Sequence, residues 1–319
     1  MSAKRRIVAL SGGVGGAKLA QGLDMLDDVD LTIVVNTGDD FEHLGLMISP
    51  DIDSVVYALA GLSDVDRGWG RADESWHFME EIRRLGGEDW FLLGDRDLAM
   101  HIARTNAIRL GEPLSSFTLR IARRLGIRAR IVPMTDDAVR TIITSDEGRL
   151  AFQRYFVGLR CEPIVRSVDF EGAPSARPVA ELETEFADPG PDAIIICPSN
   201  PYLSIDPILS IPGIADMLSA SHAPVVAVSP IIGGQAVKGP TAKIMNELGL
   251  AVTNDTIAGH YGDLIDGIVI DHGDRCPVAA SPLACLSVPT LMHTVEDKVS
   301  LARKTVDFAL SLSQPERVG

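Results

Sequence analysis

The chain has few of the residues that mark thiolate-metal, membrane or nucleic-acid proteins. Its 319 residues include four cysteines and 5% aromatic residues, and its net charge is −15. No apolar run approaches the roughly 20 residues of a membrane-spanning helix, so no membrane partner is expected. A general nucleic-acid binder needs a basic face, which this composition does not favour. With 46% hydrophobic residues, a globular protein is expected.

The cysteines and histidines form no ligand pattern. Cys161, Cys197, Cys276 and Cys285 include no CxxC pair, so all four are expected to be reduced. The seven histidines show no HxxxH or HxH spacing, which argues against a histidine-rich metal site. The first residues run directly into an apolar segment without signal-peptide features. The expected compartment is the cytoplasm.

Four short polar loops each follow a run of apolar, β-forming residues. The loops are Ser11–Lys18, Asn36–Asp40, Pro198–Pro201 and Ser229–Gly234. The preceding runs do not alternate apolar with polar residues, which indicates parallel strands buried on both faces. In open α/β sheets, ligands bind beyond the carboxyl ends of the strands, where the strand order reverses. Loops that share this edge would offer N–H groups, hydroxyls and carboxylates to a phosphate-bearing ligand.

The pattern predicts an α/β fold, with a Rossmann-like, doubly wound, mostly parallel sheet and a smaller β-containing insertion. Residues 1–133 and 188–319 form the expected core. Residues 134–187 form the expected inserted α+β subdomain, because extended runs around a polar turn predict a hairpin there. The expected helices lie at about 17–26, 49–59, 74–85, 98–110, 114–125, 205–219, 241–248 and 294–312.

The glycine-rich loop is the first candidate binding site. Its candidate residues are Ser11, Gly12, Gly13, Gly15, Gly16 and Lys18. Glycines permit positive φ and let the backbone approach phosphate oxygens. The loop is neither a Walker A element nor a GxGxxG fingerprint, since Lys18 occupies the sixth position counted from Gly13. A phosphate or nucleotide role is favoured, and a tight turn without a ligand is the alternative.

Three pairs of aspartates are the second candidate. They are Asp39 and Asp40, Asp51 and Asp53, and Asp95 and Asp97. Mg²⁺ prefers one or two carboxylates together with phosphate oxygens and water. A carboxylate can instead orient or deprotonate an attacking hydroxyl. Because Asp is also common at helix N-termini and turns, capping is the alternative for each pair.

An amide and several aromatic residues complete the candidates. Asn200 follows a buried strand, where its side chain could either read a base or hold the loop. Trp69, Trp76 and Phe91 could stack on a flat ring, although packing in the core is the favoured interpretation.

Seven ordered motifs resemble those of one known family. They are Ser11-Gly-Gly-Val-Gly-Gly-Ala-Lys18, Val35-Asn-Thr-Gly-Asp-Asp40, Ile48-Ser-Pro-Asp-Ile-Asp53, Arg67-Gly-Trp-Gly70, Leu93-Gly-Asp-Arg-Asp97, Pro198-Ser-Asn-Pro201 and Ser229-Pro-Ile-Ile-Gly-Gly234. Together they resemble the 2-phospho-L-lactate transferase family of deazaflavin coenzyme F-420 biosynthesis. The resemblance implies transfer of a phospholactyl, phosphoenolpyruvyl or phosphoglyceryl group from a guanosine-diphosphate-linked donor. The implied acceptor is 7,8-didemethyl-8-hydroxy-5-deazariboflavin (Fo), and GMP is released. A magnesium requirement and a homodimer are also implied.

The resemblance implies roles for individual residues. Asp53 matches a position associated with the deazaflavin, and Asp39 and Asp40 match an acidic position assigned to Mg²⁺. Asp40 and Asp53 are the candidates that orient or deprotonate the acceptor hydroxyl. The residues expected to bind substrates are Ser11, Gly12, Gly13, Gly15, Gly16, Lys18, Asn36, Asp53, Asp95, Arg96, Ser199, Asn200, Pro201, Ser229 and Gly233.

Two departures from the archaeal pattern make the chain resemble bacterial members. Archaeal relatives often have Thr-Gly-Thr-Pro-Lys where this chain has Val14–Lys18, and Lys where it has Leu92. The donor acid is therefore left open. The alternative function is that of a related family of nucleotide-sugar-binding proteins that regulate carbon metabolism. The acidic pairs and the segment Trp69–Gly70 favour the enzyme.

Overall fold

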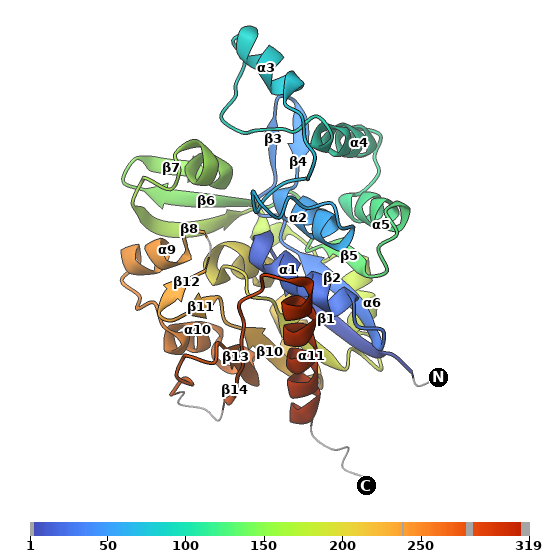
Figure 1. The fold of residues 1–319 in the computed structure, drawn as a ribbon, viewed down its shortest axis with the longest axis vertical. Helices are drawn as coiled ribbons and strands as arrows, with labels where there is room; N and C mark the ends of the chain where they lie inside the picture. The colour runs from blue at the N-terminus through green and yellow to red at the C-terminus, as the bar shows by residue number, and fades with distance from the viewer. Residues whose placement is uncertain (1–2, 238, 279–282, 314–319) are drawn as a thin grey trace.

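A parallel sheet with helices on both faces organises the chain (Figure 1). The computed structural model describes residues 3–237, 239–278 and 283–313. Within these ranges the sheet has seven strands. In spatial order they are β14 (Ala284–Ser287), β13 (Gly267–Ile270), β10 (Val225–Val228), β9 (Ala193–Ile196), β1 (Arg5–Ser11), β2 (Val29–Val35) and β5 (Arg130–Pro133). All neighbouring strands are parallel, which confirms the predicted Rossmann-like, doubly wound α/β fold.

Both faces of the sheet are buried, which explains the apolar runs without alternation. Ile7 and Ala9 of β1 pack into one core, whereas Val8 and Leu10 pack into the other. The first core is completed by α1 (Gly13–Asp24), α2 (Pro50–Leu59), α5 (Leu114–Arg124) and α11 (Val295–Leu312). The second is completed by α6 (Ala180–Phe186), α7 (Asp206–Leu209), α8 (Ile214–Ala220), α9 (Thr241–Glu247) and α10 (Asn254–Tyr261). Successive strand residues point to opposite faces, so each strand serves both cores.

Helices α1 and α11 lie in close contact on the first face. A Cβ atom at Gly22 would lie 2.2 Å from the carbonyl oxygen of Lys298, so a side chain cannot fit there. The Lys298 ammonium also donates a hydrogen bond to the Gln21 side chain at 2.7 Å. This contact joins the helix that follows the glycine loop to a helix far along the chain.

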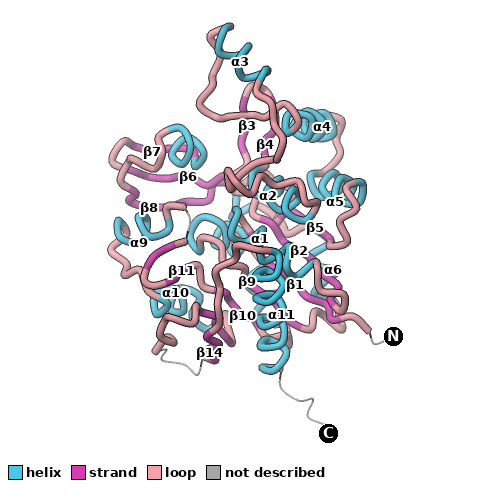
Figure 2. The backbone as a smooth tube through the Cα atoms, viewed as in Figure 1, coloured by secondary structure: helices cyan, strands magenta, loops and turns pink. Residues whose placement is uncertain are grey.

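A three-stranded antiparallel sheet lies beside the main sheet (Figure 2). Its strands are β7 (Gly148–Ala151), β6 (Arg140–Ser145) and β8 (Val165–Glu171), and the segment also contains the helical turns η1 (Arg154–Gly158) and η2 (Ala173–Ser175). The pairing of β6 with β7 confirms the expected hairpin. Val139, Ile143 and Val165 of this segment join the second core. The division into a core and an inserted subdomain at 134–187 stays a prediction.

A projecting unit combines a hairpin that was not predicted from the sequence with two helices that confirm those expected at about 74–85 and 98–110. It contains the antiparallel hairpin of β3 (Phe41–His43) and β4 (Leu46–Ile48), with α3 (His77–Arg84) and α4 (Asp97–Arg109) (Figure 1). Leu44 and Gly45 turn the hairpin with φ of 51° and 73°. Each strand has only three residues, which is too short for a periodic pattern to identify.

The single helix expected over 205–219 is wrong. The chain forms η3 (Pro201–Ile205), α7 and α8, and Gly213, with φ of 91°, precedes α8. In the described part of the chain, no single helix is long and apolar enough to cross a membrane. The bent pair Pro201–Leu209 and Ile214–Ala220 passes that test only as a pair, with an angle of 83°. The short elements β11 (Ile231–Ile232), β12 (Gln235–Ala236) and η4 (Gly262–Leu264) complete the fold.

The expectation of four reduced cysteines is also wrong. Cys276 and Cys285 form a disulfide, whereas Cys161 and Cys197 are free. Cys285 lies in the edge strand β14, and its Cα atom is 6.1 Å from that of Cys276. Their sequence spacing gives no sign of this pairing, because it depends on where the folded chain places the two residues.

Candidate active site

The carboxyl ends of β1, β2, β9 and β10 meet at one cavity of about 780 Å³. From β1 the chain continues to β2 on one side, while β9 lies against the other side of β1, so the strand order reverses here. Gly13, Asp53 and Asn200 all line this cavity. The central geometric prediction from the sequence, a shared site at one sheet edge, is therefore confirmed.

The glycine loop forms the inner wall of the cavity and the beginning of α1. Gly13 has a φ of 62°, in the left-handed region that favours glycine. A Cβ atom on Gly15 would lie 2.5 Å from the carbonyl oxygen of Pro198. The N-cap residue Gly12 has no side chain to cap α1 and the first turn contains no acidic residue, although Asp51 accepts a hydrogen bond from the Gly13 N–H. This helix N-terminus therefore offers backbone N–H groups and a favourable dipole to an anion.

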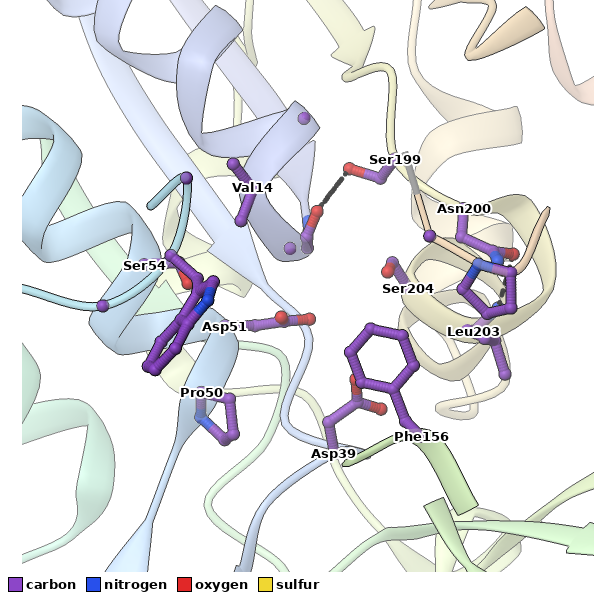
Figure 3. A pocket seen from close by; sticks show the side chains of 18 of the residues that line it. Val14, Asp39, Pro50, Asp51, Ser54, Phe156, Ser199, Asn200, Leu203 and Ser204 are labelled. Carbon is purple, nitrogen blue, oxygen red and sulfur yellow. Dashed lines mark hydrogen bonds between the residues drawn. The ribbon is translucent and has the colours of Figure 1, made fainter. Parts of the chain in front are cut away.

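Ser199 joins the glycine loop to the loop after β9. Its hydroxyl donates to the Gly12 carbonyl at 2.7 Å and accepts from the Gly12 N–H at 3.1 Å. Figure 3 shows this contact at the edge of the cavity. The paired hydrogen bonds fix the two halves of the sheet at the point where the strand order reverses.

The side-chain oxygen of Asn200 has hydrogen-bond partners, whereas its amide nitrogen has none among the described residues. Its oxygen accepts from the N–H groups of Tyr202 and Leu203 at 3.0 and 3.2 Å, which caps η3. Its buried amide nitrogen has no hydrogen-bond partner among the described residues. Both roles considered from the sequence are thus compatible with this geometry, since the oxygen holds the loop and the NH₂ group is free for a ligand. Ser229 also lines the cavity, and its hydroxyl donates to Asn254 at 2.5 Å.

Asp39 and Asp51 form an acidic wall opposite these neutral groups. Figure 3 shows both carboxylates directed into the space across which Ser199 and Asn200 lie. Burial raises the pKa of Asp51 to about 6, against hydrogen bonds from Asn36 and the Gly13 N–H. Burial, together with the charge of Asp51, raises the pKa of Asp39 well above its usual range. Two buried carboxylates that repel each other beside an anion site are a fitting pair of ligands for Mg²⁺.

Asp40 lies behind this wall, outside the cavity lining. One of its oxygens accepts from the Ser49 hydroxyl at 2.8 Å, and the other has no partner among the described residues. Burial raises its pKa to about 7. Of the two residues expected to bind metal, only Asp39 thus reaches the cavity.

Asp53 belongs to a buried network between α2 and α4. It forms an ion pair with Arg104, and the Nδ1 atom of His101 lies 3.7 Å from its second oxygen. The other ring nitrogen of His101 lies 3.2 Å from Asp97, which also accepts a hydrogen bond from the Tyr57 hydroxyl. Burial raises the pKa of Asp53 although Arg104 and His101 oppose the shift. The Oδ2 atom of Asp53, which faces His101, is buried and has no hydrogen-bond partner among the described residues, so it remains an unpaired acceptor in a residue that lines the cavity.

His101, Arg104 and Tyr57 were missed by the sequence analysis. Asp97, His101 and Arg104 lie on one face of α4, and their spacing of four and three residues is the signal that could have identified them. The ligand atoms of Asp53, Asp97 and His101 lie within 4.8 Å of one another, a spacing that could hold a metal ion. The guanidinium of Arg104 already supplies the cation beside Asp53, so Asp39 and Asp51 suit a metal better.

Aromatic side chains form the outer wall of the cavity. Trp69, Trp90 and Phe91 line it, and Trp69 is 46% exposed. The Arg67 guanidinium lies 5.0 Å from the Trp69 ring and 4.8 Å from the Trp76 ring. Trp76 itself lies outside the lining. Exposed rings at a cavity mouth can cover a flat ligand, which favours the stacking role for Trp69.

Several expected substrate residues lie outside the lining. Asp95 accepts from the N–H groups of His77 and Phe78 at 3.2 and 3.0 Å and so caps α3, and Arg96 lies beside Asp73 at 3.7 Å. The remaining residues of this kind are Ser11, Gly16, Asn36, Pro201 and Gly233. Asn36 acts from behind, because its amide donates to Asp51 at 2.9 Å.

Comparison with known proteins identifies the family. A family model described as 2-phospho-L-lactate transferase CofD matches residues 7–282. The chain belongs to this family. A phosphoenolpyruvate transferase of Kitasatospora aureofaciens is 40% identical over 325 residues, which cover 98% of this chain and 99% of the relative. A 2-phospho-L-lactate transferase of Methanosarcina mazei is also 40% identical, over 94% of this chain and 99% of the relative. The resemblance found in the sequence is confirmed.

A solved structure shares the fold at much lower identity. A member of the UPF0052 family from Bacillus halodurans matches with a TM-score of 0.63 and 16% identity, covering 96% of this chain and all of that one. This similarity shows the fold alone. The family match and the names of the relatives give no support to the alternative function as a nucleotide-sugar-binding regulator.

Proposed function

We propose that this transferase family member moves a phospho-three-carbon-acid group from a guanosine-diphosphate-linked donor to the deazaflavin Fo and releases GMP, as a step in coenzyme F-420 biosynthesis. The observation that carries the proposal is the shared cavity, which joins a glycine-rich helix N-terminus, paired carboxylates and an aromatic wall. The names of the relatives support both the phosphoenolpyruvyl and the phospholactyl donor.

The glycine loop and the acidic wall suit the diphosphate of the donor. The backbone N–H groups of Val14 and Gly15 lie in the first turn of α1, at the cavity, and can bind phosphate oxygens. Asp39 and Asp51 would hold Mg²⁺, with Asp51 in the role expected from sequence for Asp40. The ion, when bound, neutralises phosphate charge and stabilises the GMP leaving group. Asn200 and Ser229, on the neutral side, can position the nucleotide through an amide and a hydroxyl.

Asp53 suits the acceptor. The aromatic wall can cover the flat deazaflavin ring while its terminal ribityl hydroxyl reaches the carboxylate of Asp53, which lines the cavity. The hydroxyl oxygen attacks the phosphorus that bears the three-carbon acid, and its proton passes to Asp53. A new phosphorus–oxygen bond forms, the bond to the bridging oxygen breaks, and GMP leaves with that oxygen. Arg104 and His101 hold Asp53 in place, which favours this role over one for Asp40.

A transfer assay tests the proposal. Purified protein is mixed with Fo, Mg²⁺ and each GDP-linked donor in turn, and the product is identified by mass spectrometry. We expect a phosphodiester with at least one donor and strict dependence on added Mg²⁺ after chelation. Asp53→Asn should lose most turnover, whereas Asp40→Asn should retain more. No product with any donor would overturn the proposal, and wild-type turnover in Asp53→Asn would remove that residue from the reaction.

The homodimer and the cytoplasmic location stay predictions. Size-exclusion chromatography with light scattering tests the first, and fractionation of the source cells tests the second.

A further inference from the structure

A wall of the cavity that the proposed function does not use comes from the segment after β7. Phe152, Phe156 and Arg160 of this segment all line the cavity. The rings of Phe152 and Phe156 are stacked, with centroids 5.3 Å apart and planes inclined by 11°. Figure 3 shows the Phe156 ring beside Asp39 and Ser204, at the cavity. Phe156 belongs to η1, a π-helical turn, and such turns are frequent at functional sites. The segment therefore presents an apolar surface followed by a cation.

Arg160 differs from Lys18 and Arg67, the other lysine and arginine residues of the lining that the structure describes. The Lys18 ammonium donates to the Met292 carbonyl at 2.8 Å. Arg67 forms an ion pair with Asp64 at 2.7 Å and stacks on two tryptophan rings. Arg160 forms no hydrogen bond or ion pair with any residue that the structure describes. Its guanidinium is thus available to an anion in the cavity.

The backbone at Arg160 adopts a conformation that an arginine rarely takes. Arg160 and Cys161 have φ of 50° and 58°, both in the left-handed region. The Cys161 N–H, which donates to the Tyr155 carbonyl at 3.0 Å, holds this turn. Glycine or asparagine would suit the position better. Strained backbone of this kind occurs at functional sites, where a particular side chain is required.

We infer that Arg160 binds the carboxylate of the three-carbon acid, with Phe156 beside its carbon skeleton. The inference rests on the proposed function, because it concerns the donor. The helix N-terminus and Asp39 with Asp51 serve the diphosphate, so the carboxylate is the remaining donor anion that needs a cation. A planar guanidinium matches a carboxylate with two parallel hydrogen bonds. The diphosphate presents similar oxygen atoms, and the test separates the two.

The experiment compares donor and GDP binding in three variants. Arg160→Asn removes the positive charge, and asparagine tolerates the left-handed backbone. Arg160→Lys keeps a positive charge but lacks the planar guanidinium that can form two parallel hydrogen bonds. Arg166→Asn is the matched control, because Arg166 is exposed on β8 and outside the cavity lining. For Arg160→Asn we expect the KM for the GDP-linked donor to rise about 10- to 100-fold. The Kd for GDP, which lacks the acid, should stay unchanged. Arg160→Lys should recover part of the loss.

Each other outcome has a definite meaning. An unchanged donor KM in Arg160→Asn would overturn the inference. A matched loss of GDP affinity would assign Arg160 to the diphosphate and overturn the carboxylate role. Absence of GDP binding and turnover in the wild-type protein would overturn the proposed function, which separates that failure from failure of the inference. Thermal unfolding checks that Arg160→Asn is folded, and it should be at least as stable as the wild type because the backbone strain is relieved.

Discussion

The α2 side of the cavity and the β9 and β10 side differ in charge and in how their polar groups are bonded. On the α2 side, carboxylates are buried and already bonded, as Asp51 is to Asn36 and Asp53 is to Arg104. On the β9 and β10 side, the groups are neutral, and the amide nitrogen of Asn200 has no partner among the described residues. A fixed, charged wall suits groups whose charge changes during a reaction, because it does not reorganise. A neutral wall with free donors suits recognition, because it binds an anion without adding charge of its own.

Replacing a carboxylate of the charged wall should have the largest effect. Asp51→Asn keeps the shape of the side chain but removes one of the two negative charges that Asp39 and Asp51 provide. We expect kcat/KM for transfer to fall about 10²- to 10³-fold, because phosphate charge is no longer neutralised. Steady-state kinetics at saturating Mg²⁺ measure this. Asp263→Asn, at an exposed site outside the cavity, is the control and should match the wild type. Equal rates in the two variants would mean that the charged wall plays no part in transfer.

A side chain at Gly15, where the glycine loop contacts the loop after β9, should have the second-largest effect. A methyl group at Gly15 would lie 2.5 Å from the Pro198 carbonyl oxygen, which is a backbone atom and cannot move away as a flexible side chain could. Gly15→Ala should lower the free energy of unfolding by about 1–3 kcal/mol and weaken GDP binding. Urea unfolding and calorimetry measure the two. Gly259→Ala in α10, which has open space around it, should be neutral or stabilising by up to about 1 kcal/mol. If the two variants have the same free energy of unfolding, the close approach of Gly15 to Pro198 does not contribute to stability.

The pH dependence of stability should report the buried carboxyls. Asp40 and Asp51 have pKa values raised to about 7 and about 6 by burial, against roughly 3.9 in the unfolded chain. Between these limits the folded protein binds more protons than the unfolded chain, so stability falls as pH rises. Each group contributes up to about 1.4 kcal/mol per pH unit. Urea midpoints from pH 5 to 8 in a chelating buffer measure the slope.

A variant and the metal sharpen this result. Asp40→Asn should make the slope shallower between about pH 6 and 7, where Asp51 has largely titrated and Asp39 still contributes. Added Mg²⁺ should stabilise the protein more at pH 8 than at pH 5, because it binds ionised carboxylates. A flat profile in the wild-type protein would contradict the raised pKa values.

The smallest effect should come from an aspartate that only caps a helix. Asp95→Ala removes the acceptor for the His77 and Phe78 N–H groups, which should lower the urea midpoint slightly. Transfer kinetics should remain close to those of the wild type, because Asp95 lies outside the cavity lining. A large rise in KM for Fo would instead return Asp95 to the substrate site.

The sequence predicted the sheet edge better than the charged wall. Strands such as Ala193–Ile196 are continuous apolar runs, and loops that follow parallel strands must share an edge. This reasoning brought Gly13 and Asn200 together correctly. It could not predict that Asp39 lines the cavity while Asp40 does not, because the side chains of neighbouring residues in a loop point in different directions. The ion pair of Asp53 with Arg104 depends on the packing of α2 against α4, for which no local pattern exists.

The contact of Gly22 with the Lys298 carbonyl has a consequence for how the molecule is built. The helix that begins at the glycine loop is partly covered by a segment made long after it, as the hydrogen bond across 277 residues between Lys298 and Gln21 also shows. During synthesis, the part of α1 that packs against α11 stays uncovered until residues 295–312 have left the ribosome. The cavity is lined by Thr290, Leu291 and Met292 as well as by the glycine loop, so it is also completed late, although its first residues are among the earliest to be made.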